Sequence, residues 1–198
     1  MMDPPYSESC EQNREPILAA LQAHLQQVQS LLEIGSGTGQ HAVYFAPEFP
    51  GLTWQTSDRR ENHAGILAWM ESMPADNLRP PLALDVGHDS WPDQAFDAVF
   101  SANTAHIMGE PEVMAMFDGV GGLLPRGGRF LLYGPFNIDG RYTAPSNERF
   151  DQMLRAQDPR MGVRDCGWLE QLADRAGMRL EKILDLPADN KLLVWIRP

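Results

Sequence analysis

The chain has few lysines, few cysteines and no long apolar run. Of its 16 basic residues only Lys182 and Lys191 are lysines, and 27 acidic residues bring the net charge to −11. Such a surface is poorly suited to neutralising many phosphates, which argues against nucleic acid as a partner. The apolar stretches fall well short of the roughly 20 residues that span a bilayer. We therefore expect no membrane insertion.

The scarcity of cysteine also excludes several kinds of site. Cys10 and Cys166 lie far apart, so they give neither a disulfide framework nor a metal-ligand spacing. The five histidines do not cluster in a zinc pattern, and we expect no metal. Residues 1–11 lack the basic and apolar regions of a signal peptide, so we expect a cytoplasmic protein.

A chain of 198 residues with 43% hydrophobic and 22% charged residues is typical of one globular domain, here residues 1–198. Helical and strand patterns alternate, which predicts an α/β sheet covered by helices. The predicted strands are 30–34, 52–57, 81–84, 96–101, 129–133, 179–186 and 192–197. The predicted helices are 16–28, a helix from the glycine turn to Pro47, 62–73 with Met73 inward, 113–124, and 165–177 with Asp165 as N-cap.

The hydrophobic pattern does not distinguish a monomer from a homodimer.

The most informative segment is a glycine turn after the first strand. The strand ends near Glu33, and Gly35, Gly37 and Gly39 alternate after it, as expected where backbone lies close to a ligand. A dinucleotide-binding turn has its third glycine at the sixth position, which is Gln40 here. The spacing therefore argues against a dinucleotide.

Polar residues lie at the ends of four successive strands. They are Glu33, Asp58, Asp85 and Asn103. In an open α/β sheet, ligands bind beyond the carboxyl ends of the strands. We therefore expect these four residues to belong to one site.

The acid-x-Gly-x-Gly-x-Gly pattern resembles motif I of the class I S-adenosylmethionine-dependent methyltransferases. The resemblance implies a three-layer Rossmann-like fold, whose seven-stranded, mostly parallel sheet has an antiparallel strand in its C-terminal hairpin. It also implies S-adenosylmethionine as cofactor, lying over the three glycines. Asp58 would accept the ribose hydroxyls, Asp85 the adenine amino group, and the Val86 N–H would donate to the ring. Backbone at Gly35 and around Asn103 would hold the methionyl group. Glu33 either joins this site or only orients the loop.

Several longer segments are similar to a narrower family, the methyltransferase-like proteins catalogued as domain of unknown function 938. The matching segments are 7–18, 31–41, 103–107 and 146–165, so the resemblance covers nearly the whole chain. Gln12 stands where arginine is common in that family, and Thr104-Ala105 replaces a larger apolar pair. The family implies the fold and the cofactor, but it implies no settled substrate or catalytic residue.

Candidate catalytic residues follow from the chemistry of methyl transfer. The methyl group of a sulfonium is already activated, so a base is needed only for a nucleophile that holds its proton tightly. His106 is the best candidate base, with a hydrogen-bonded loop histidine as the alternative. Tyr142, with Tyr133 and Asn137, is a candidate for the lining of an acceptor pocket.

Three further residues have two interpretations each. Arg164 either pairs with an acceptor carboxylate or forms an ion pair with Asp151 or Asp165 that pins the long loop. Asn13 and Arg14, taken to open the first helix, are either a solvated helix end or part of the cofactor site, with Arg14 at the cofactor carboxylate.

We interpret the chain as a methyltransferase acting on a small molecule, because little lies outside the predicted core. The exceptions are residues 1–30, expected to cover the cofactor site, and residues 134–164, expected to be partly helical on the substrate side. One alternative is a non-catalytic S-adenosylmethionine-binding protein. Another is an NADP-dependent oxidoreductase using Arg59-Arg60, although Asp58 would repel the 2′-phosphate.

Overall fold

The computed structural model describes residues 3–198; Met1 and Met2, which open the predicted N-terminal segment, lie outside the described residues. The helices are α1 (Glu8–His24), α2 (Gln40–Phe45), α3 (His63–Ser72), α4 (Glu110–Leu123), α5 (Pro145–Gln157) and α6 (Cys166–Arg175). The strands are β1 (Ser30–Ile34), β2 (Thr53–Asp58), β3 (Leu78–Ala83), β4 (Ala98–Ala102), β5 (Arg129–Asn137), β6 (Arg164–Asp165), β7 (Arg179–Leu186) and β8 (Asn190–Ile196). Short 3-10 turns occupy Ala46–Glu48 and Arg60–Asn62.

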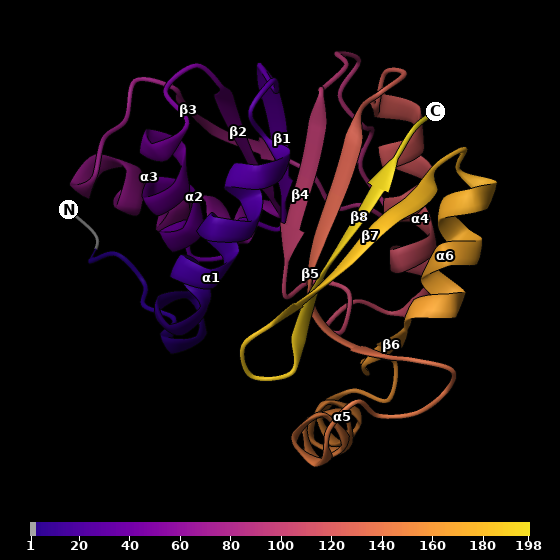
Figure 1. Cartoon of the computed structure of the whole chain (residues 1–198). Coiled ribbons are helices and arrows are strands. Elements are labelled where there is room, and N and C mark those ends of the chain that lie inside the picture. The colour runs from indigo at the N-terminus through magenta and orange to yellow at the C-terminus, as the bar shows by residue number, and fades with distance from the viewer. Residues whose placement is uncertain (1–2) are drawn as a thin grey trace.

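One mixed sheet runs through the molecule in the order β3-β2-β1-β4-β5-β8-β7 (Figure 1). Strands β1 to β5 are parallel, and β8 is antiparallel to both of its neighbours. The two-residue β6 pairs beside the end of β5. The predicted α/β fold, with a mostly parallel sheet and an antiparallel strand in the C-terminal hairpin, is confirmed.

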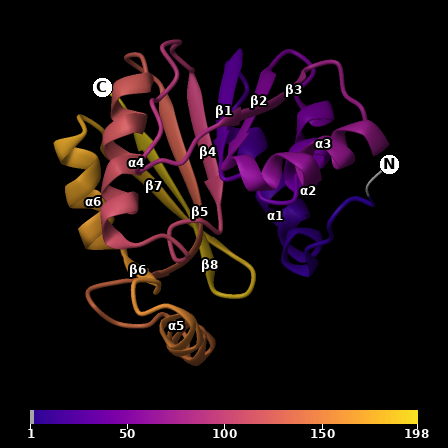
Figure 2. The same cartoon turned by 180° about the vertical axis from the view of Figure 1, so that it is seen from behind.

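Helices cover both faces of the sheet, which explains why its central strands are apolar on both sides. Helices α1, α2 and α3 lie on one face, and α4 and α6 lie on the other (Figures 1 and 2). Trp54 and Phe100 are buried on the first face, and Phe117 and Trp195 on the second. Burying each such aromatic side chain contributes about 1.5–3 kcal/mol.

The first helix begins eight residues earlier than predicted, at Glu8 rather than near Pro16. Ser7 is its N-cap, and the Ser7 side chain accepts a hydrogen bond from the Cys10 backbone N–H. Glu8 and Glu11 lie in the first turn, where the helix dipole favours negative charge. The start signal was therefore Ser7, and the helix continues through Pro16.

The bounds of one strand were predicted correctly, and those of two others were not. β1 coincides with the prediction, but β3 begins at Leu78 rather than Pro81. Because β3 is an edge strand, its prolines interrupt no second ladder. β5 extends to Asn137, since it stays paired with β8 as far as Pro135.

Two predicted helix details have opposite outcomes. Asp165 is the N-cap of α6, as predicted, because its side chain accepts a hydrogen bond from the Gly167 backbone N–H. Met73 was predicted to point inward, but it follows the end of α3 and is 46% exposed. None of the helices among residues 3–198 has the length and apolarity needed to cross a membrane.

Helix α5 lies across the edge of the sheet at which the parallel strands end (Figure 1). Near its beginning, the Asn147 side-chain amide donates to the Asp189 carbonyl in the β7–β8 turn at 3.2 Å. Beyond its end, the Gly162 backbone N–H donates to the His106 carbonyl at 2.9 Å. The partly helical segment predicted for 134–164 is thus ordered and tied down at both ends.

Candidate functional site

The glycine turn lies at the carboxyl end of β1 and has a left-handed backbone at all three glycines. The φ angles are 69° at Gly35, 58° at Gly37 and 94° at Gly39. A Cβ at Gly35 would come within 2.6 Å of the Thr104 side chain, and one at Gly39 within 2.9 Å of the Ile66 Cα. At Gly37 the nearest atom to such a Cβ is the Gly35 carbonyl oxygen, 4.0 Å away. Gly35 and Gly39 therefore serve packing, whereas Gly37 leaves room for a ligand.

Asp58, at the end of β2, is joined directly to this turn. One carboxylate oxygen accepts from the Gly37 backbone N–H at 2.7 Å. The other accepts from the Arg59 backbone N–H at 2.7 Å and from the Asn62 side chain at 2.8 Å. With 6% exposure, the carboxylate is held in one orientation beside Gly37. The structure thus brings the strand-end carboxylate Asp58 to the glycine turn.

Glu33 lies beneath the turn, in a different environment. Its carboxylate accepts from the Ser36 hydroxyl at 2.9 Å and from the Trp54 indole N–H at 3.1 Å. Burial raises the pKa of Glu33 to about 7; the charge of Asp58 adds to this rise, and the two hydrogen bonds oppose it. These contacts favour the interpretation in which Glu33 orients the loop.

The ends of β3 and β4 contribute the other predicted residues. Asp85 is partly exposed and accepts from the Gly87 backbone N–H at 3.2 Å. The hydrogen bond with His88 is the main reason that the pKa of Asp85 is lowered. Val86 is buried beside it. Asn103 has a φ of 58°, and its backbone N–H donates to the Tyr133 carbonyl at 2.9 Å.

Asn13 and Arg14 lie in the first half of α1 and contact different side chains. The Asn13 side-chain oxygen lies 2.7 Å from Nε2 of His41. The Arg14 guanidinium lies over the Tyr44 ring, 4.5 Å from its centre, and forms an ion pair with Glu11 at 2.6 Å. Both residues therefore contact α2, Asn13 through His41 and Arg14 through Tyr44, and the Arg14 guanidinium is already paired with Glu11. The sequence analysis placed both residues at the start of the first helix, but α1 begins at Glu8, five residues before Asn13.

Tyr133 on β5 lies under α1, near Asn13 and Asn190. Burial raises the pKa of Tyr133 to about 12, and the Asn13 and Asn190 side chains act in the opposite direction. Tyr142, by contrast, is 41% exposed and donates to Asp151 on α5 at 2.8 Å. The two tyrosines expected in one acceptor pocket thus have different partners. Asn137 has a buried side-chain oxygen without a hydrogen-bond partner among residues 3–198.

His106 follows β4 and faces α5. Its ring packs edge-on against Phe150, with 5.1 Å between ring centres, and the residue is 6% exposed. Burial lowers the pKa of His106 to about 4, and the nearby positive charge of Arg164 adds to this effect. Within residues 3–198 the imidazole makes no hydrogen bond to another side chain. It is therefore neutral near pH 7.

Arg164 holds the segment after α5 rather than facing a ligand. Its guanidinium donates to the carbonyls of Ala105 at 3.1 Å, Arg160 at 2.7 Å, and Met108. It forms an ion pair with Glu110 at 3.8 Å, and not with Asp151 or Asp165, the acids named in one of its two interpretations. Arg164 has this partner because β6 places its side chain under the loop that precedes α4.

Asp151 is the buried acid that fixes α5. It accepts from the Val163 backbone N–H at 2.7 Å and from Arg155 at 2.8 Å, in addition to Tyr142. Tyr142 and Arg164, the other two catalytic candidates, are therefore both engaged in holding the 134–164 segment together.

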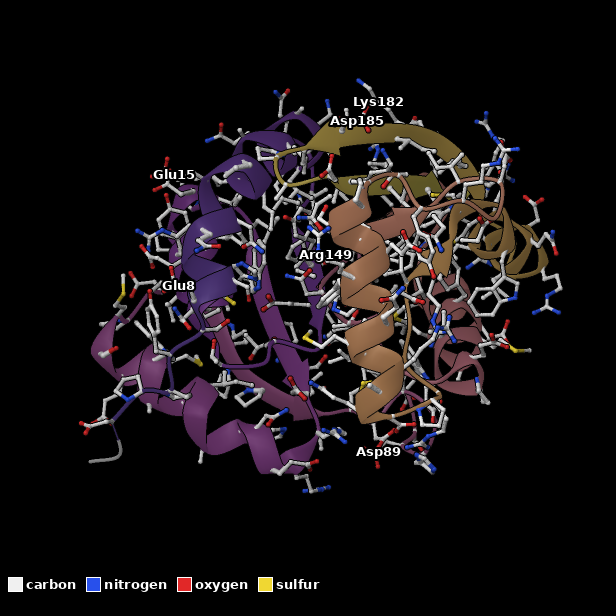
Figure 3. The ribbon with its side chains drawn as sticks, turned by 90° about the horizontal axis from the view of Figure 1, so that it is seen from below. Glu8, Glu15, Asp89, Arg149, Lys182 and Asp185 are labelled. Carbon is white, nitrogen blue, oxygen red and sulfur yellow. The ribbon has the colours of Figure 1, made fainter. Side chains whose placement is uncertain are left out.

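Two helices flank the predicted site from outside. Figure 3, seen from below, shows α5 over the carboxyl edge of the sheet with α1 beside it. Glu8 lies on α1, and Arg149 lies on the flank of α5 that faces α1. The exposed Arg149 forms no ion pair among residues 3–198.

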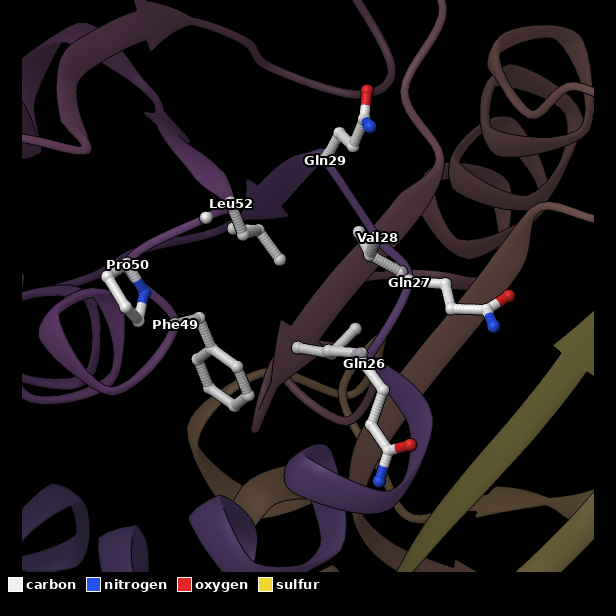
Figure 4. Close-up of a pocket in the computed structure, with 9 residues that line it drawn as sticks. Gln26, Gln27, Val28, Gln29, Phe49, Pro50 and Leu52 are labelled. Atoms are coloured by element: carbon white, nitrogen blue, oxygen red, sulfur yellow. The ribbon is translucent and has the colours of Figure 1, made fainter.

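A surface hollow of about 370 Å³ lies elsewhere, lined by residues 25–29 and 49–52 (Figure 4). These segments precede β1 and β2. The hollow is therefore at the amino ends of the parallel strands, opposite the glycine turn, and it contains none of the predicted site residues. No group of three His, Cys, Asp or Glu side chains is arranged for a metal in the described part of the chain.

Sequence reasoning missed Gln40 and His41 as site residues. Both are buried, and both contact the N-terminal segment. Gln40 had been considered only as a residue that argues against a dinucleotide turn. Their place in a segment shared with a known family was the available signal.

Comparison with known proteins supports this description of the fold. The model of a family described as "Protein of unknown function (DUF938)" matches residues 4–197. Among solved structures, the S-adenosylmethionine-dependent methyltransferase SibL in its apo form is 21% identical, with a TM-score of 0.81 over 96% of this chain and 56% of that chain. Human N-acetylserotonin methyltransferase in complex with SAM is 16% identical, with a TM-score of 0.81 over 96% of this chain and 53% of that one.

A third solved structure with this fold is CalO1, a methyltransferase in calicheamicin biosynthesis, in its SAH-bound form. It is 18% identical, with a TM-score of 0.77 over 96% of this chain and 55% of that chain. The chain spans about half the length of these structures. At these identities the likeness shows the fold.

Proposed function

The chain belongs to the DUF938 family, and from this premise we propose that it is an S-adenosylmethionine-dependent methyltransferase acting on a small-molecule acceptor. The observation that carries the proposal is the bond between Asp58 and Gly37, which fixes a buried carboxylate beside the open position of the glycine turn. The three methyltransferase structures with this fold support it, two of them bound to SAM or SAH.

The residues present fit this cofactor. Gly37 leaves space above the turn, and Asp58 retains acceptor capacity for ribose hydroxyls, because each carboxylate oxygen can accept more than one hydrogen bond. Asp85 and the Val86 N–H are assigned to the adenine. The backbone at Gly35 and Asn103, with the Asn13 side chain, is assigned to the methionyl group. Glu33 acts indirectly by bracing the turn.

When bound, S-adenosylmethionine supplies a methyl group on a sulfonium centre. The chain itself positions the acceptor and excludes water, and these two effects contribute most of the rate in such a displacement. We assign this role to His106, in the loop after β4, and to Phe150 on α5, whose rings pack against each other. Arg164 and Tyr142 keep α5 in place, so we assign them positioning rather than contact with the acceptor.

The environment of His106 restricts the acceptors that it can assist. A neutral imidazole with a pKa of about 4 is a weak base, so it can accept a proton only from a nucleophile that releases one readily. We therefore favour an acceptor whose nucleophilic atom is acidic or already free of protons. The exposed Arg149 on the flank of α5 that faces α1 is suited to an acceptor that carries negative charge.

A non-catalytic S-adenosylmethionine-binding protein is the second candidate, and it is favoured by the contacts of Tyr142 and Arg164, both of which are engaged within the fold. An NADP-dependent oxidoreductase has less support. Arg59, a proposed phosphate partner, forms an ion pair with Glu61 at 3.2 Å, and the buried Asp58 would repel the 2′-phosphate.

Calorimetry separates the cofactor alternatives. We expect heat of binding with S-adenosylhomocysteine and none with NADPH. Binding of NADPH without binding of S-adenosylhomocysteine would overturn the methyltransferase proposal.

Incubating the protein with labelled S-adenosylmethionine and metabolite extracts then distinguishes an enzyme from a non-catalytic S-adenosylmethionine-binding protein. We expect label in the low-mass fraction. The variant His106→Ala should lower this transfer while cofactor binding is kept, and His24→Ala, at the far end of α1, is the matched control. Cofactor binding without transfer in any extract would favour the binding protein.

A further inference from the structure

The N-terminal segment is attached to the glycine turn by the side chain of Gln40. Its amide oxygen accepts from the Ser7 backbone N–H at 2.5 Å, and its amide nitrogen donates to the Ser7 carbonyl at 3.4 Å. Gln40 is 7% exposed and directly follows Gly39. The residue that begins α2 therefore holds the N-cap of α1.

The next residue, His41, makes a second attachment six residues further along the chain, at Asn13. Its Nε2 lies 2.7 Å from Oδ1 of Asn13, and its ring stacks on Phe45 with 5.1 Å between ring centres. Burial lowers the pKa of His41 to about 4, so the ring is neutral. Because Oδ1 can only accept, Nε2 carries the proton.

This hydrogen bond determines which way the Asn13 amide faces. With Oδ1 turned toward His41, the two N–H donors of Nδ2 are directed away from α2. Tyr133, whose hydroxyl is influenced by the Asn13 side chain, lies on that side. Asn13 thus presents donors, and not its acceptor, toward the carboxyl edge of the sheet.

A third attachment fixes the chain before α1. The Trp69 indole N–H donates to the Pro5 carbonyl at 2.6 Å. Gly65 allows this approach, since a Cβ there would come within 2.7 Å of the Pro5 ring. Side chains of α2 and α3 therefore hold three successive points of the segment from Pro5 to Asn13.

We propose that Gln40 and His41 are positioning residues that fix α1 over the glycine turn and orient the Asn13 amide to donate to the carboxylate end of the cofactor. This inference rests on the proposed function. It gives Gln40 a reason to stand where a dinucleotide site has glycine, because Gly39 already supplies the close packing of α2 against α3. The proposal also links the glycine turn to α1, because Gln40 and His41, which contact the N-terminal segment, directly follow Gly39.

The test compares His41→Leu, which removes the donor and keeps the bulk, with His41→Gln, whose amide nitrogen can replace Nε2. S-adenosylhomocysteine affinity is measured by calorimetry, and hydrogen exchange is followed at the backbone amides of α1. We expect His41→Leu to weaken binding about fivefold to tenfold, as for one lost hydrogen bond, and to speed exchange in α1. His41→Gln should keep most of the S-adenosylhomocysteine affinity and most of the protection of α1 from exchange. Gln12→Ala, an exposed change on the same helix, should alter neither.

A double-mutant cycle with Asn13→Ala distinguishes positioning from general stabilisation. If His41 acts through Asn13, His41→Leu should weaken binding less than about twofold when Asn13 is already alanine. Equal losses in both backgrounds, or unchanged affinity in His41→Leu, would overturn the inference while cofactor binding by the unaltered protein still supports the proposed function. Absence of S-adenosylhomocysteine binding by the unaltered protein would instead overturn the proposed function, and the inference with it.

Discussion

Two carboxylates flank the glycine turn, and their surroundings give them different roles. Asp58 accepts three hydrogen bonds from N–H groups and lies beside Gly37, where a ligand has room. Glu33 accepts from a hydroxyl and an indole in a fully buried position. Burial without a positive partner disfavours the charged form. Asp58 is therefore suited to binding a ligand beside Gly37, and Glu33 is suited to holding the glycine turn in place.

Replacing Asp58 by alanine tests the binding role. We expect S-adenosylhomocysteine affinity to fall about tenfold to a hundredfold, because hydrogen bonds to a charged group contribute about 1.5–3 kcal/mol. Calorimetry gives the affinity, and thermal unfolding reports the stability lost with the bond to Gly37. Glu61→Ala, an exposed acid three residues away, is the control. Unchanged affinity in Asp58→Ala would count directly against the ribose assignment.

The raised pKa of Glu33 predicts a pH dependence of stability. Between its ordinary value of 4.5 and about 7, folded Glu33 keeps a proton that the unfolded chain releases, so stability falls as pH rises through this window. At about 1.36 kcal/mol for each pKa unit, the loss is at most about 3 kcal/mol. Glu33→Gln should remove it, which denaturant unfolding at several pH values will show. Parallel pH profiles for the two proteins would contradict the prediction.

At the scale of elements, the six-residue α2 depends on close packing against α3. Gly39 combines a φ of 94° with a Cβ position 2.9 Å from the Ile66 Cα, so a side chain there would strain the backbone and push the helices apart. Gly127 has a φ of 83° but nothing within 4 Å of its Cβ position. The two glycines thus separate the cost of backbone strain from the cost of overpacking.

We expect Gly39→Ala to lower the free energy of unfolding more than Gly127→Ala does. The Gly127 variant should lose about 1–2 kcal/mol from the left-handed backbone alone. Overpacking should add about 1–3 kcal/mol in the Gly39 variant. Denaturant unfolding of both variants measures the difference. Equal losses would show that α3 moves aside without cost.

Elements were predictable from sequence where one signal dominated. The apolar run into the glycine turn defined β1, and Asp165 marked the start of α6. The start of α1 was missed because proline is common near helix starts, whereas the capping signal was Ser7. The end of β5 was missed because it depends on pairing with β8, which is distant in sequence.

At the scale of the whole molecule, the sequence predicted which residues lie at the carboxyl edge better than it predicted their partners. Strand order alone brings Asp58 to the glycine turn. The partners of Arg14 and Arg164 depend on side-chain direction and on the path of distant loops, and both arginines are engaged within the fold. Gln40 and His41 were missed because their partners, the N-cap Ser7 and Asn13 on α1, lie more than 25 residues earlier.

The charge of the whole molecule predicts weak interaction with nucleic acid. Within residues 3–198, seven of the 16 basic side chains are already in ion pairs with acids of the chain. The other nine would have to displace counterions from phosphates against a net charge of −11. We expect no binding of fluorescent duplex DNA or single-stranded RNA in anisotropy titrations at about 50 mM salt, where non-specific contacts are strongest. Saturable binding that weakens steeply with added salt would contradict this and would make a macromolecular acceptor the better proposal.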